Sequence, residues 1–102
     1  MRVIKAKQIR RWAADHASAA ASLNHWLEMA RKANWKSFAD VRMVCPSADQ
    51  VLVKSRHTVL VFNIARNDFR LIVAAHYDKA RLYTLRFMTH AEYSRNKWKA
   101  EL

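Results

Sequence analysis

The sequence predicts an α+β domain in which two N-terminal helices pack on a small antiparallel β-sheet and a short C-terminal helix follows. Three observations predict this class. Apolar residues recur every three or four positions between residues 9 and 30, which is the helical period. Four apolar segments with short links follow from residue 50, as in an antiparallel meander. Residues 89–92 then match a capping box, which predicts the start of the last helix.

The helical pattern covers residues 5–34, and neither glycine nor proline interrupts it. One long helix is compatible with this pattern. We favour two helices with a break at residues 16–19, because helices of more than about 25 residues are uncommon in small domains and Ser18 offers a cap. Before them, Val3 and Ile4 favour an extended edge strand at residues 1–4.

After the helices, residues 38–46 are predicted to be a connecting segment that ends at Pro46, with Trp35 and Phe38 as core anchors. The predicted strands are residues 50–54, 59–64, 69–75 and 82–87. The chain contains no glycine, so Asn67 is the residue expected to adopt a positive φ in the reversal at residues 65–68.

Positive charge dominates the composition. There are 19 Lys and Arg against 8 Asp and Glu, a formal net charge of +11. The first fifty residues hold 9 basic and 4 acidic groups, and the remaining fifty-two hold 10 and 4, so the excess is spread over the chain. Such a field attracts polyanions, which points to nucleic acid or an acidic protein as partner.

Several classes of protein are disfavoured. Cys45 is the only cysteine, so an intramolecular disulfide is impossible, and a reducing compartment is expected. The five histidines lack metal-ligand spacing, so neither a metal site nor another cofactor is predicted. No signal-peptide core or membrane-length apolar run is present. We therefore expect a single domain over residues 1–102, cytoplasmic and without membrane association.

Cationic and titratable residues gather in two late segments, residues 62–71 and 85–95. RNA cleavage without a metal needs a base, an acid and cations for the phosphorane charge. His90 and Tyr93, three residues apart on one helix face, are candidates for proton transfer, although Tyr93 would need nearby cations to lower its pKa. Arg70 and Arg86 are candidates for holding phosphate oxygens. Further RNA-binding candidates are Lys54, His57, Arg66, Arg95 and Lys97.

These residue types also have structural interpretations. An arginine on a strand can face solvent or pair with an acid such as Asp68 or Asp78, and a tyrosine can be a core residue. Spacing alone identifies no catalytic dyad. It leaves three classes open: a ribonuclease, a non-catalytic module that binds RNA or the ribosome, and a basic interaction protein for an acidic partner.

Three segments carry a resemblance to a known family. The runs WLEMARKANWKSFADVRMVCPSADQV, VFNIARNDFRLIV and THAEYSR resemble the HigB-type toxins of the RelE superfamily. The resemblance implies a RelE-like fold and an mRNA interferase, a metal-independent endoribonuclease that cuts mRNA during translation on the ribosome. It also implies neutralisation by a HigA-type helix-turn-helix antitoxin, with promoter DNA bound only through the complex.

Individual residues follow from these motifs. Asn67, here an RNA-binding candidate, and Arg70 match the family's N-x-[YF]-R positions, while His90, Glu92 and Tyr93 match its T-H-x-E-Y ending. Glu92 is assigned to the helix cap rather than to catalysis. Two positions depart from the pattern. Arg66 stands where the family usually has glycine, and Ser94 replaces the usual aspartate after Tyr93.

Overall fold

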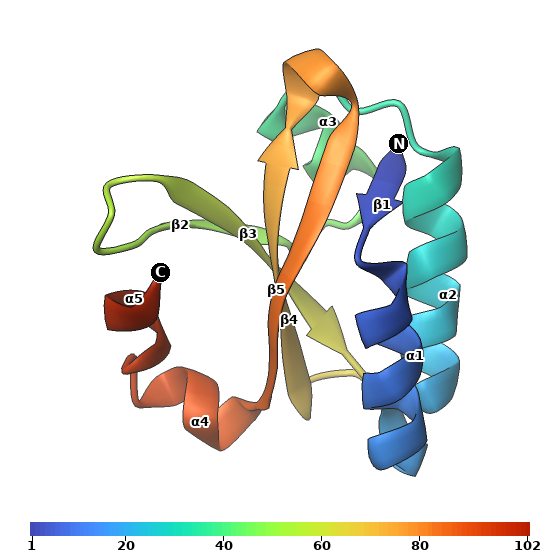
Figure 1. Ribbon diagram of the computed structural model, residues 1–102, viewed down its shortest axis with the longest axis vertical. Helices are drawn as coiled ribbons and strands as arrows, with labels where there is room; N and C mark the ends of the chain where they lie inside the picture. The colour runs from blue at the N-terminus through green and yellow to red at the C-terminus, as the bar shows by residue number, and fades with distance from the viewer.

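A computed structural model describes residues 1–102 as a five-stranded sheet with helices on both faces (Figure 1). This confirms the α+β class. The strands are β1 (Arg2–Ile4), β2 (Asp49–Leu52), β3 (Thr58–Ile64), β4 (Phe69–His76) and β5 (Arg81–Thr89). The helices are α1 (Ala6–Asp15), α2 (Ala20–Lys32), α3 (Phe38–Val44), α4 (His90–Ser94) and α5 (Trp98–Glu101), with short 3₁₀ turns at Ala17–Ala19 and Tyr77–Lys79.

The strand order in the sheet is β1-β5-β4-β3-β2. Strands β2 to β5 form the predicted antiparallel meander. The expectation of a wholly antiparallel sheet is wrong at one edge, where β1 pairs in parallel with β5. The physical reason is that α1 and α2 follow β1, so the chain crosses one face of the sheet before β2 begins at the opposite edge (Figure 1).

The break between α1 and α2 lies where it was predicted. Its cause is different, because Ser18 caps nothing: the residue before α2 is Ala19, and no side chain caps that helix. His16 ends α1, with Nδ1 3.1 Å from the Trp12 carbonyl oxygen. Its ring meets Phe69 and Phe87 edge-on, which ties the break to the sheet. Tertiary packing therefore sets the helix boundary here.

Two apolar clusters lie on opposite faces of the sheet. On the first face, α1 and α2 bury residues such as Ile9 and Leu23 against Leu71 of β4. On the second face, Trp98 of α5 packs with Val53, Val59, Val61, Ile72 and Met88. The C-terminal segment thus partly covers the face that the N-terminal helices leave open (Figure 1).

Helix α3 was not predicted, because the segment at residues 38–46 was expected to lack regular structure. The helix has only seven residues, and no side chain caps its start at Ser37. A helix this short gives weak periodicity and depends on packing, here through fully buried Val41. Trp35 is buried as predicted, and Phe38 packs half-buried at the edge of the first cluster.

The β3–β4 turn is built without glycine, and Asn67 is not the residue that adopts a positive φ. Ala65 and Arg66 do so, with φ of 52° and 65°. A left-handed conformation costs a residue with a Cβ atom roughly 1–2 kcal/mol. Arg66 is the position at which the resembling family usually has glycine, which has no such cost. Asn67 instead binds another side chain, as described below.

Replacing Trp98 by alanine should destabilise the protein by about 3–5 kcal/mol. The indole is 4% exposed, and its Nε1 donates a hydrogen bond of 3.1 Å to the Tyr93 carbonyl oxygen. The free energy of unfolding in urea would measure the loss. Leu52→Ala is the control, because that apolar side chain is 63% exposed and should contribute little. Equal effects of the two substitutions would show that α5 is not part of the core.

Candidate functional site

Arg70 is the centre of the candidate site. It lies on β4 opposite Met88 and beside Asn63, on the second face of the sheet, and its side chain is only 7% exposed. Its Nη1 donates to the carbonyl oxygens of Asn67 (3.0 Å) and Phe69 (3.1 Å). Its Nη2 donates to Asn67 Oδ1 at 2.6 Å and contacts His90 Nδ1 at 3.0 Å. These four contacts use all four Nη hydrogens.

The charge of Arg70 has no anionic partner. The only ion pair within 4.0 Å in the chain joins Arg86 and Glu101. Burying a cation without a counter-charge is costly, and neutral acceptors only partly offset the cost. The ring of Tyr93 adds a cation–π contact at 5.4 Å from the guanidinium carbon. We call Asn67, Arg70, His90 and Tyr93 the Arg70 cluster; its net character is that of an anion site.

His90 is the first residue of α4 and is exposed. A guanidinium nitrogen can only donate, so His90 Nδ1 must be the acceptor in the contact with Arg70. The ring is then neutral, with its proton on Nε2. The contact therefore fixes both the orientation and the tautomer of the imidazole, and it leaves an N–H group as the outward polar atom.

Tyr93 lies one helical turn after His90, half-buried between Arg70 and Trp98. Its ring stacks on that of Trp98 at 5.3 Å between centroids and 20° between planes. Burial raises the pKa of the Tyr93 hydroxyl, and the charge of Asp49 raises it further, while Arg70 lowers it. The condition that nearby cations lower the pKa of Tyr93 is therefore not met. Tyr93 stays protonated at neutral pH, which suits a proton donor and not a base.

A capping box holds His90 and Tyr93 in place. The Glu92 backbone N–H donates to Thr89 Oγ1 at 3.2 Å, and the Thr89 N–H donates to Glu92 Oε1 at 3.2 Å. The prediction that a helix begins at His90 is confirmed, as is the capping role of Glu92. Ser94, at the position where the resembling family has aspartate, donates its hydroxyl to the His90 carbonyl oxygen at 2.9 Å.

Thr89→Ala should lower the free energy of unfolding by about 1 kcal/mol, because the Glu92 N–H loses its acceptor. Chemical denaturation would measure the change. Thr89→Ser is the matched control, since it keeps the hydroxyl and should stay near wild type. A loss of the same size in both variants would mean that packing of the threonine methyl group, and not the cap, is what matters.

Arg86 does not join the Arg70 cluster, although it lies on the same face of the sheet, opposite Ile72. It lines a separate pocket of about 250 Å³ with Arg95 and Lys97. Glu101 of α5 lies 3.8 Å from Arg86 Nε, and both side chains are partly exposed. Three of the predicted cations are thus grouped here, on the other side of α4 from Arg70, with a carboxylate already beside one of them.

The other predicted RNA-binding residues are placed elsewhere. Lys54 and His57 lie at the β2–β3 turn, about 20 Å from the Arg70 end of β3 by strand length. His57 lines a pocket of about 450 Å³ there. Arg66 is exposed in the β3–β4 turn and lines another pocket, next to α2. The predicted site residues therefore fall into two groups, the Arg70 cluster and the cations around Arg86. The remaining three, Lys54, His57 and Arg66, lie apart from both groups.

Sequence reasoning missed two residues of this region, Trp98 and Glu101. Trp98 stacks on Tyr93, and Glu101 pairs with Arg86. Both come from α5, which folds back after Asn96, a residue with φ of 61°. Asparagine tolerates this left-handed conformation better than most residues, so Asn96 was the available signal for the reversal.

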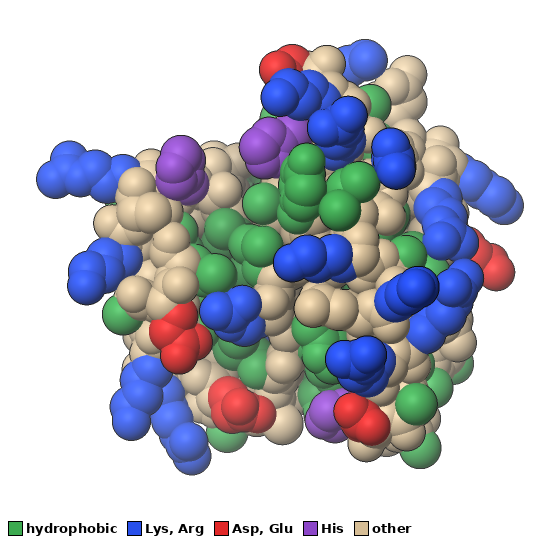
Figure 2. Space-filling view, viewed as in Figure 1, with side chains coloured by type: hydrophobic (Ala, Val, Ile, Leu, Met, Phe, Trp, Pro, Cys, Tyr) green, Lys and Arg blue, Asp and Glu red, His purple; other side chains and the backbone are tan.

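Lysine and arginine side chains are scattered over the face shown in Figure 2, with few acidic groups among them. No group of three or more His, Cys, Asp or Glu side chains is placed to hold a metal ion. No helix is both long and apolar enough to cross a membrane. The surface thus offers positive charge over a wide area, and the Arg70 cluster is distinguished by burial rather than by charge density.

A comparison with protein-family models decides the family. Residues 19–96 match the model of the HigB toxin, described as the RelE-like toxic component of a toxin-antitoxin system. The chain belongs to the HigB toxin family. The match spans more than half of the chain, and the α+β structure with its five-stranded sheet is consistent with a RelE-like fold. Among curated proteins, no match was found.

Family membership makes this HigB chain the toxin of a toxin-antitoxin pair, so it has an antitoxin as partner. The matched residues include the whole Arg70 cluster, together with Arg86 and Arg95. They exclude α1 and α5, so Trp98 and Glu101 lie outside the match. The matched residues therefore do not include α5, which covers part of the second face.

Proposed function

We propose that this HigB toxin is a metal-independent endoribonuclease that cleaves mRNA during translation on the ribosome, and that a HigA-type antitoxin neutralises it. The observation that carries the proposal is Arg70, a buried cation with no carboxylate partner, held against His90 and Tyr93. Because the chain belongs to a family of RelE-like toxins, we assign RNA as the anion that this site binds, and the net charge of +11 favours binding of such a polyanion.

The first role of the Arg70 cluster is to stabilise negative charge on the reacting phosphate. Fixed cations and N–H donors aimed at developing charge act strongly in a site that excludes water. Arg70 supplies the charge, and the Nε2–H of His90, which the contact with Arg70 orients before RNA binds, supplies a donor. In the free protein the Nη hydrogens of Arg70 are all engaged, so direct contact with phosphate requires that the phosphate replace some of these acceptors.

The second role is proton transfer. When a phosphate draws the Nη2 hydrogens of Arg70 away, His90 Nδ1 is released and can accept the proton of the ribose 2′-hydroxyl. The 2′-oxygen then attacks the phosphorus, and the bond to the 5′-oxygen breaks. Tyr93, protonated at neutral pH, donates its proton to that leaving oxygen. The products are a cyclic phosphate end and a free 5′-hydroxyl end.

The remaining cations bind RNA away from the reacting bond. Arg86, Arg95 and Lys97 offer phosphate a second contact across α4, in a pocket that Glu92 and Glu101 also line, and Lys54 and His57 extend the contact to the β2–β3 turn. Arg66 contributes from the β3–β4 turn. A ribosome-bound message would contact these separated groups at the same time. Promoter DNA enters only through the complex with the antitoxin.

Expression in cells tests this function. Induction of the wild-type chain should arrest growth and produce new cuts inside translated regions, mapped by primer extension. An Arg70→Ala/Tyr93→Phe double mutant that accumulates as a folded protein should give neither. Arrest by the wild type with intact mRNA would contradict the nuclease and favour a toxin that binds the ribosome without cutting.

A further inference from the structure

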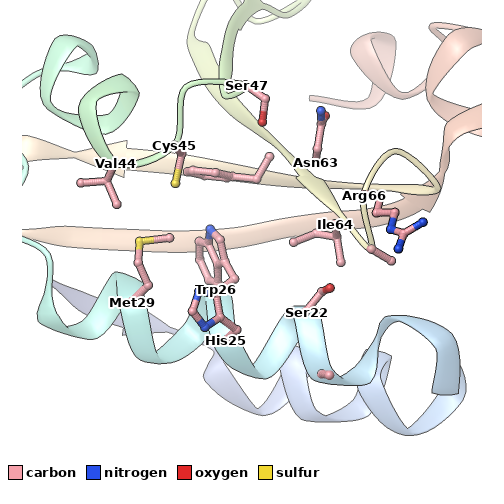
Figure 3. A pocket seen from close by; sticks show the side chains of 13 residues that line it. Ser22, His25, Trp26, Met29, Val44, Cys45, Ser47, Asn63, Ile64 and Arg66 are labelled. Atoms are coloured by element: carbon pink, nitrogen blue, oxygen red, sulfur yellow. The ribbon is translucent and has the colours of Figure 1, made fainter.

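The largest pocket of the chain lies on the other side of the β3–β4 turn from the Arg70 cluster. It has a volume of about 520 Å³ and opens between α2, the α3–β2 connection and the end of β3. Figure 3 shows Trp26 and Met29 rising from α2 toward Val44 and Cys45 on the opposite wall. We call this cavity the α2 pocket. Its size is that of a site for a small ligand or a few side chains of a partner.

Two groups at the α2 pocket lack hydrogen-bond partners in the free chain: a buried indole N–H and one edge of a strand. Trp26 is 3% exposed and lines the pocket, yet its indole Nε1 has no hydrogen-bond partner. A buried donor without an acceptor is costly, so an occupant that supplies an acceptor would be favoured. One edge of β3 is also free at this end, because β2 pairs with it only over residues 58–61, while Asn63 and Ile64 extend beyond and pair with β4 on the other edge alone. An open strand edge is a template for an added strand.

The surroundings of the α2 pocket indicate the chemistry of the occupant. Met43 and Val44 are 83% and 56% exposed at the end of α3, which places uncovered apolar surface beside the opening. His25 and Arg66 lie on the rim, and none of the 13 lining residues is acidic. The α2 pocket and its surroundings therefore suit an extended peptide that carries an apolar side chain flanked by carboxylates.

We propose that the α2 pocket and the open end of β3 form the docking site for an extended, acidic segment of the antitoxin. The segment pairs with β3 beyond Val61 and inserts an apolar side chain over Trp26. This inference rests on the antitoxin partner of the HigB family and not on the nuclease activity. It also places the antitoxin against the β3–β4 turn. Asn67 of this turn accepts two hydrogen bonds from Arg70, so bound antitoxin would contact the segment that holds Arg70 in place.

Cys45 reports directly on occupancy, because it is the only cysteine of the chain and lines the α2 pocket. It is half-buried, and burial raises the pKa of its thiol, so alkylation is best followed at mildly alkaline pH with denatured toxin as reference. The probe is the cognate antitoxin, purified from co-expression. We expect N-ethylmaleimide to label Cys45 at least about tenfold more slowly in the complex than in free toxin.

Two pairs of variants test the site by affinity. Ala21→Trp fills the pocket from an exposed position on α2, and Ala14→Trp places the same ring on an exposed position of α1 away from it. Val44→Asp adds a negative charge beside the acidic segment. Leu52→Asp adds the same charge at a similarly exposed site outside the pocket. The first member of each pair should weaken antitoxin binding about tenfold or more, and the second should not. Circular dichroism of each purified variant shows that it is folded.

Several results would overturn the proposal. Wild-type affinity of Val44→Asp together with unchanged labelling of Cys45 in the complex would place the antitoxin elsewhere, even if Ala21→Trp failed to fold. Protection of Cys45 that rises with toxin concentration alone would assign the pocket to a second copy of the chain. Protection by RNA without antitoxin would assign it to the substrate. None of these readouts depends on whether the toxin cleaves RNA.

Discussion

Arg70→Met is expected to lower the rate of mRNA cleavage by a factor of about 10²–10³, the range found when one donor to transition-state charge is removed. Methionine matches the arginine side chain as far as Nε and fills that part of the buried space, so the main loss is the guanidinium group with its charge and its hydrogen bonds. Asn67 and His90 then lose their common partner, and His90 is no longer held in one tautomer. The rate should be measured under single-turnover conditions on ribosome-bound message.

Two controls separate the charge of Arg70 from its shape and from general electrostatics. Arg70→Lys keeps the charge but not the planar fork, so it should fall between wild type and Arg70→Met. Arg10→Met removes an exposed charge from α1 and should cleave at the wild-type rate. If Arg70→Met and Arg10→Met were both as active as wild type, Arg70 would have no part in the reaction.

Tyr93→Phe should lower the cleavage rate by about 10²–10⁴, the usual contribution of a positioned acid or base. The substitution removes only the hydroxyl. The phenylalanine ring can keep the stacking on Trp98 and the contact with the Arg70 guanidinium, so stability should change little. Tyr77→Phe is the matched control, because the Tyr77 hydroxyl is buried without a hydrogen-bond partner away from the Arg70 cluster.

The dependence of the cleavage rate on pH distinguishes a donor from a base. Burial raises the pKa of Tyr93 above its ordinary value of about 10, so the phenol is protonated throughout the neutral range. As a donor it should support full activity there and lose it only as pH rises through the raised pKa. As a base it should instead become more active as pH rises. A Tyr93→Phe profile with the same alkaline limb as wild type would exclude the donor role.

Much of the fold could be predicted because its signals are local. The 3–4 period of α1 and α2, the alternation of β3 and β4, and the Thr89–Glu92 capping box each lie within one segment. What could not be predicted depends on distant partners. The parallel pairing of β1 with β5 joins residues about eighty positions apart. The positive φ of Ala65 and Arg66 is imposed by closure of the hairpin and not by residue type.

The candidate site shows the same division. Arg70, His90 and Tyr93 were predicted from residue type and motif, and the structure brings them together. Arg86 was expected in the same corner, but it lies opposite Ile72, two residues further along β4 from Arg70, and pairs with Glu101 of α5 instead. The direction of the Tyr93 pKa could not be predicted either, because it depends on Trp98 and Asp49, which reach Tyr93 only through the tertiary fold.

The most direct test is cleavage of one defined message, bound to purified ribosomes, by purified toxin. The wild type should cut it at a reproducible position and leave a cyclic phosphate end, and a single 2′-deoxy nucleotide at that position should block the cut. An Arg70→Met/Tyr93→Phe double mutant, folded by circular dichroism, should leave the message intact. If the wild type bound the ribosome and left the RNA whole, the Arg70 cluster would not be a nuclease site.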